Sequence, residues 1–115
     1  MIDKVRTWAR ILKMAKRSAF PLITRERLMS DERAGFKEKL EYDAFSRPHF
    51  AYGIYFAALQ AKALGIKGIS VYEFGVGWGG GLLEMEKVAD MVTRETSVLV
   101  DVYGFDTGSG IAQAP

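Results

Sequence analysis

The sequence predicts an α/β protein built around two parallel strands. Residues 69–76 and 98–105 are short runs rich in β-branched and aromatic residues, as in strands, and residues 82–94 between them have a helical pattern. The order strand, helix, strand predicts a parallel pair with a right-handed crossover. The chain has 115 residues, 49% of them hydrophobic and 26% charged. This balance indicates one globular domain and excludes a wholly disordered or fibrous protein.

A further helix is expected ahead of the first strand, from about residue 48 to 64. Pro48 suits a first helical position, and Gly65 suits the residue just past the end. The apolar residues between them follow helical spacing: Tyr52, Tyr55, Phe56, Leu59, Ala63 and Leu64. We therefore divide the chain into a basic helical segment, 1–46, and the start of an α/β domain, 47–115.

The segment 22–45 is charged and mixed, and its pattern predicts short helical pieces. Ser30 is predicted to cap one of them, because a serine hydroxyl accepts hydrogen bonds from the first amides of a helix. Asp31 and Glu32 would then lie in the first turn of that helix, where the dipole favours negative charge. Nothing in this segment predicts catalytic chemistry.

Positive charge is concentrated in the first part of the chain. Residues 1–47 contain 12 basic and 7 acidic residues, whereas residues 48–115 contain 4 and 7. Residues 2–17 are predicted to form a basic amphipathic helix. Its apolar face consists of Ile2, Val5, Trp8, Ala9, Leu12 and Ala15. Such a helix docks on the protein body or contacts an anionic membrane peripherally. Without a second basic segment, nucleic-acid binding is not expected.

Several classes of protein are excluded by what the sequence lacks. The absence of cysteine excludes a disulfide scaffold, a Cys-ligated zinc site and a thiol nucleophile. No charge-free apolar run approaches the roughly 20 residues that span a bilayer. The first residues lack the pattern of a signal peptide. We expect a cytoplasmic protein without a metal site.

The chemistry is expected in the turn between the first strand and the helix after it. Five of the seven residues 75–81 are glycine. Glycine permits positive φ and lets a ligand approach the backbone closely, and the first amides of the following helix are open to an acceptor. A tight strand-to-helix turn requires one or two glycines. The presence of five glycines therefore favours a ligand site.

Two ligand patterns overlap in this turn. Gly75, Gly77 and Gly80 fit the dinucleotide pattern G-x-G-x-x-G. Glu73, Gly75, Gly77 and Gly79 fit acid-x-G-x-G-x-G instead. A carboxylate at the end of a central strand favours a cationic group and gives nothing to a pyrophosphate. A dinucleotide-binding (NAD or FAD) oxidoreductase domain is therefore the alternative, and the missing Gly-Lys-Ser/Thr disfavours a nucleoside triphosphate.

A second acid follows the second strand. Asp106 is placed to accept hydrogen bonds from both hydroxyls of a ribose. The alternative for Asp106 is a structural role in a turn or a helix cap. His49, the one histidine of the chain, is expected near the surface at a helix start.

Residues 47–115 resemble the start of a class I S-adenosylmethionine-dependent methyltransferase, nearest to the macrocin and sugar O-methyltransferase group. Glu73-Phe-Gly-Val-Gly-Trp-Gly79 looks like the first motif of that family, and Tyr103-Gly-Phe-Asp-Thr107 looks like the second. Arg47-Pro-His-Phe-Ala-Tyr-Gly53 is similar to the segment that precedes them. The resemblance implies a Rossmann-like fold, S-adenosylmethionine as cofactor and a small-molecule acceptor such as a sugar hydroxyl.

The resemblance also assigns roles to individual residues. It implies that Gly75, Gly77 and Gly79 pass under the cofactor. Glu73 would lie near the methionine end, Asp106 would hold the ribose, and Tyr52 would cover the carboxylate end. It identifies no catalytic residue, because the motifs include neither a base nor the acceptor pocket.

The sequence also departs from the family. After Asp106-Thr107, relatives continue with an aromatic and acidic stretch that is missing here, and Trp78, Gly80 and Gly81 are unusual. The family fold has seven strands and this sequence supplies two. We therefore expect the 115 residues to be the N-terminal part of a longer protein and to be inactive alone. A non-enzymatic module that uses residues 2–17 to bind a membrane or a partner is the other alternative.

Overall fold

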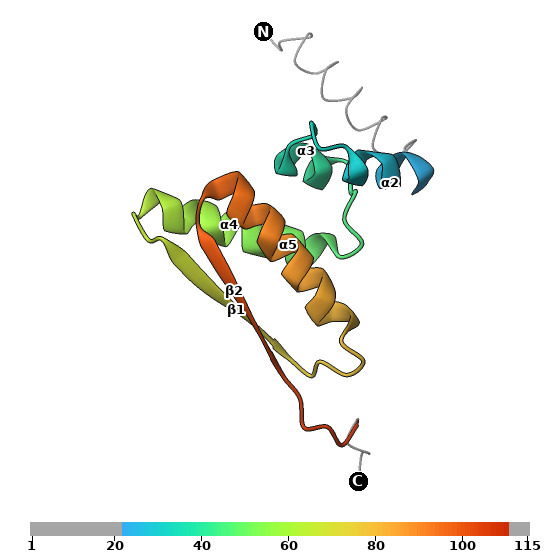
Figure 1. Ribbon diagram of the computed structural model, residues 1–115, viewed down its shortest axis with the longest axis vertical. Helices are drawn as coiled ribbons and strands as arrows, with labels where there is room; N and C mark the ends of the chain where they lie inside the picture. The colour runs from blue at the N-terminus through green and yellow to red at the C-terminus, as the bar shows by residue number, and fades with distance from the viewer. Residues whose placement is uncertain (1–21, 111–115) are drawn as a thin grey trace, which may run out of the picture. The chain divides into compact units, whose positions relative to one another are not determined.

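The computed structural model describes residues 22–110, which form a mixed α/β arrangement (Figure 1). The helix expected at residues 2–17 lies outside the described residues. The chain separates into two compact units, Met1–Pro48 and His49–Pro115. The candidate site belongs to the second unit, so the first is described briefly and by itself.

The described part of the first unit contains two short helices, α2 (Leu22–Ser30) and α3 (Phe36–Glu41). They are the short helical pieces that the sequence predicts for this segment. The rings of Phe36 and Phe45 lie 4.8 Å apart, centroid to centroid, and both side chains are buried. This aromatic pair therefore forms part of the buried apolar contacts among the described residues of the unit.

The predicted role of Ser30 as a helix N-cap is wrong. Ser30 is the last residue of α2, and its hydroxyl donates back to the carbonyl of Glu26 at 3.0 Å. Asp31 and Glu32 follow in the turn, and a carboxylate oxygen of Asp31 accepts a hydrogen bond from the Arg33 amide at 2.9 Å. The next helix begins after Gly35, which provides no side-chain cap.

The second unit begins with α4 (Pro48–Ala63), which has the bounds that the sequence predicts to within one residue. The helix ends at Gly65, whose φ of +73° lets the chain leave the helix. The amide of Ile66 donates to the carbonyl of Ala61 at 2.8 Å and closes the helix end. The buried stripe of α4 consists of Ala51, Ile54, Tyr55, Ala58 and Ala61.

Two parallel strands and the helix between them complete the unit. Strand β1 (Gly68–Phe74) pairs with β2 (Leu99–Phe105) in a register that runs from Gly68 opposite Leu99 to Phe74 opposite Phe105. Helix α5 (Gly80–Thr96) joins them and lies against β2 (Figure 1). The predicted strand-helix-strand order and the parallel pairing are confirmed. The strand predicted to end at Val76 ends at Phe74, and α5 is longer than predicted.

The strands are not buried on both faces, although runs with this composition are typical of buried strands. Residues of β1 alternate between half-buried and exposed, because successive side chains of a strand point to opposite faces of the pair, and α5 packs on one face through β2. The other face exposes the aromatic side chains Tyr72, Phe74, Tyr103 and Phe105. The core of this unit consists instead of buried residues of α4, α5 and one side of β2, among them Val88, Val92 and Val100.

Met85 tests the packing of α5. Its side chain is 6% exposed, so Met85→Ala removes buried apolar contacts and should lower the free energy of unfolding by about 2–5 kcal/mol. Leu83, two residues earlier, is 68% exposed, and Leu83→Ala should change it by less than about 0.5 kcal/mol. Urea denaturation of both variants measures the difference. Equal losses would show that α5 does not pack through this face.

Candidate functional site

The turn between β1 and α5 lies at the carboxyl end of the parallel pair. Three of its residues, Gly75, Gly77 and Gly79, have positive φ values of +83°, +55° and +84°. The amide of Gly75 donates to the carbonyl of Phe105 at 2.8 Å, which ties the start of the turn to β2. These glycines are required by the backbone conformation, because other residues rarely adopt it.

Asp106 connects the end of β2 to the middle of this turn. Its Oδ2 accepts a hydrogen bond from the Gly77 amide at 2.8 Å, and its Oδ1 accepts one from the Gly108 amide at 2.7 Å. The backbone amide of Gly77, then that of Gly108, lowers the pKa of Asp106 below its usual value. The carboxylate is therefore ionised at neutral pH, and each of its oxygens has a bond to the backbone.

Glu73 is the last residue but one of β1, and its side chain lies beside the start of α5. An added Cβ at Gly81 would lie 2.1 Å from Oε1 of Glu73, so the carboxylate is in close contact with the first turn of the helix. Its Oε2 is buried and has no hydrogen-bond partner among residues 22–110. A buried carboxylate oxygen without a partner is costly, and a donor from a ligand would satisfy it.

The structure thus gathers Glu73, the three glycines and Asp106 around one turn. Tyr52 is not part of this group in any recorded contact. It is 58% exposed on α4, and its ring lies 4.5 Å from that of Phe56, centroid to centroid. His49 is exposed at the start of the same helix, as expected.

Sequence reasoning missed two features of this site. Gly81 leaves room for the Glu73 carboxylate, and Gly104 of β2 leaves room for Val76 and Leu82. An added Cβ at Gly104 would lie within 3.0 Å of side-chain atoms of both residues. The one available signal was the length of the glycine run, which exceeds what the acid-x-G-x-G-x-G pattern requires. The exposed side chain of Trp78 lies at the tip of the turn.

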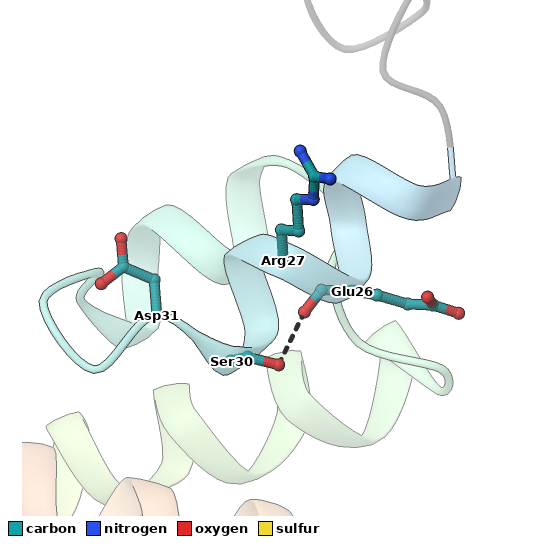
Figure 2. A pocket seen from close by; sticks show the side chains of 4 residues that line it. All are labelled: Glu26, Arg27, Ser30 and Asp31. Atoms are coloured by element: carbon teal, nitrogen blue, oxygen red, sulfur yellow. Dashed lines mark hydrogen bonds between the residues drawn. The ribbon is translucent and has the colours of Figure 1, made fainter.

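Two grooves in the described part of the chain lie away from this turn. One, on α2, is lined by Glu26, Arg27, Ser30 and Asp31, and Figure 2 shows the charged side chains pointing in different directions. The other, between α5 and β2, has three carboxylates on its rim: Glu86, Asp90 and Asp101. Asp90 forms an ion pair with Arg94. Neither groove brings catalytic groups together, and the described residues contain no group of side chains suited to a metal ion.

No helix among the described residues has the length and apolar character that a membrane-spanning segment requires. The chain matches no protein-family model, no curated protein and no solved structure. The glycine turn and its two acids are therefore the features of this chain from which a function can be inferred.

A methyl group added at Gly81 should move the Glu73 carboxylate. Because Oε1 lies where that methyl would go, we expect Gly81→Ala to shift the ¹³C resonance of the Glu73 carboxyl group. Gly80→Ala is the matched control, since nothing lies within 4 Å of its added Cβ, and it should leave that resonance unchanged. NMR of both variants checks the contact. An unshifted resonance in Gly81→Ala would place Glu73 elsewhere.

Proposed function

We propose that the chain binds S-adenosylmethionine and forms the cofactor-binding part of a methyltransferase with a Rossmann-like fold. One observation carries the proposal: two carboxylates, Glu73 beside Gly81 and Asp106 bonded to Gly77, both contact the glycine run at the carboxyl end of parallel strands. Ligands of open α/β sheets bind at this end. The resemblance of residues 47–115 to this enzyme class supports the same assignment.

The chemistry of the two acids suits the two ends of this cofactor. S-adenosylmethionine has an ammonium group and a sulfonium centre at one end and a ribose with two hydroxyls near the other. Oε2 of Glu73 is buried and has no partner among the described residues, so the carboxylate gains a hydrogen bond and charge pairing if its side chain turns toward the ammonium group. Asp106, held ionised by backbone amides, can accept from the ribose hydroxyls.

The same geometry disfavours a dinucleotide. A pyrophosphate binds at such a turn through free backbone amides. Here the Gly77 amide donates to Asp106, and the Gly75 amide donates to Phe105. Two carboxylates beside the turn would also repel the phosphates. The alternative of an NAD or FAD oxidoreductase domain is therefore the weaker one.

The role of this chain in the reaction is to bind and orient the cofactor. Methyl transfer is an in-line displacement, which depends on the alignment of the donor carbon with the acceptor. The cofactor supplies the activated methyl group. Glu73 and Asp106 would fix its two ends, and the glycines would let it lie against the backbone. We assign none of the described residues to the acceptor, a sugar or other small-molecule hydroxyl, and we expect this chain alone to be inactive.

Calorimetric titration with S-adenosylhomocysteine tests the proposal. We expect saturable binding and an affinity at least tenfold lower for Glu73→Gln, because the amide presents one acceptor fewer and no charge. Glu86→Gln is the control, since Glu86 is an exposed residue of α5 with the same charge change.

Two outcomes would contradict the proposal. Absence of binding at millimolar S-adenosylhomocysteine would exclude the cofactor, and enhanced NADH fluorescence on mixing would favour the dinucleotide alternative. An equal effect of the two glutamine substitutions would show that Glu73 has no particular role.

A further inference from the structure

The middle of the glycine turn is held by one carboxylate. Gly75 is tied to Phe105, and Gly79 bonds to Val76 within the turn itself. Between them, Gly77 and Trp78 are exposed. The hydrogen bond from the Gly77 amide to Asp106 is the one recorded bond that connects these two residues to another part of the described chain. It spans 29 residues of sequence.

The same carboxylate also shapes its own loop. Its Oδ1 accepts the amide of Gly108, a residue with φ of +70°. Asp106 therefore joins two backbone segments, the turn after β1 and the loop after β2. Both segments lie at the end of the sheet where the proposed cofactor binds.

A carboxylate has about four lone-pair sites. The amides of Gly77 and Gly108 occupy one site on each oxygen, and the amide of Val76 also contributes to the lowered pKa, so at most two sites remain for a ligand. Two sites are what a ribose with two hydroxyls needs. Asp106 can hold the turn and accept a ribose at the same time.

We propose that Asp106 is a positioning residue for the glycine turn, so that one carboxylate both fixes Gly77 and Trp78 and receives the ribose of the ligand. The connection to the ligand rests on the proposed function. The positioning role does not, because it concerns contacts within the chain. The hydrogen bond from Gly77 to Asp106 then also holds the neighbouring residue, Trp78, at the tip of the turn.

The experiment compares Asp106→Asn with Asp101→Asn, without ligand. Asp101 is an exposed residue of β2, the strand that ends just before Asp106, and it makes no side-chain hydrogen bond among the described residues. Its substitution changes the charge equally. In Asp106→Asn, one oxygen is replaced by an amide group that cannot accept. We expect at least tenfold faster hydrogen exchange at the amide of Gly77 or Gly108, and no change at either in Asp101→Asn.

Trp78 provides a second readout. The chain has two tryptophans, so Trp8→Phe leaves Trp78 as the single tryptophan, which is excited selectively at wavelengths where tyrosine does not absorb. In that background, Asp106→Asn should lower the fluorescence anisotropy of Trp78, because the tip of the turn becomes less constrained. Asp101→Asn should not.

A pH titration separates positioning from a general loss of structure. The partners recorded for Asp106 are backbone amides, and no charged side chain contributes to its lowered pKa. Its pKa is below the usual 3.8, so the bond to Gly77 should persist above about pH 4 and be lost as the pH falls through that lower pKa. The amide resonance of Gly77 should follow this titration in the wild type and not in Asp106→Asn.

The outcomes separate this inference from the proposed function. Unchanged exchange at Gly77 and Gly108 in Asp106→Asn would overturn the positioning role, even if S-adenosylhomocysteine binds to the wild type. Faster exchange together with no binding of S-adenosylhomocysteine would support the positioning role and exclude the cofactor.

Discussion

The packing of α5 against the strand pair is the constraint on which the candidate site depends. The side chains of Val88 and Val92 are fully buried, so the helix lies close to the strands. Residues 75–79 must therefore connect β1 to a helix that starts directly over it. At Gly81 and Gly104 an added Cβ would meet side-chain atoms of Glu73, Val76 and Leu82 within 3.0 Å, and those side chains would have to shift. Part of the glycine run thus serves this packing, and Gly75, Gly77 and Gly79 serve the conformation of the turn.

Electrostatics then decides which ligands the turn can accept. Two acids flank it, and the amide of Gly77 already donates to one of them. An anion would meet two carboxylates and fewer free donors than the glycine pattern alone suggests. A ligand that carries positive charge and hydroxyl donors meets acceptors instead. The acids, more than the glycines, distinguish the proposed cofactor from a dinucleotide.

The sequence predicted those features that depend on local pattern. The order of β1, α5 and β2 and the end of α4 at Gly65 follow from residue spacing and from glycine at a helix end. The structural role of Ser30 was not predicted correctly from the sequence. Serine suits an N-cap, but its hydroxyl can also donate back to a carbonyl at the end of a helix, as it does here. The approach of Glu73 to Gly81 and the bond from Gly77 to Asp106 were also missed. These contacts depend on how the elements pack, which the pattern of one strand or one turn does not encode.

The aromatic face of the strand pair is physically separate from the acids. Side chains alternate along a strand, so Glu73 faces α5 whereas Tyr72 and Phe74 point to the opposite face. The rings on that face are stacked across the strands, with centroids 5.3 Å apart for Tyr72 and Tyr103 and 5.4 Å apart for Phe74 and Phe105. Such cross-strand pairs contribute about 0.2–1 kcal/mol each. They stabilise the pair on the face that α5 does not cover, and they hold together the two strand ends from which Glu73 and Asp106 extend.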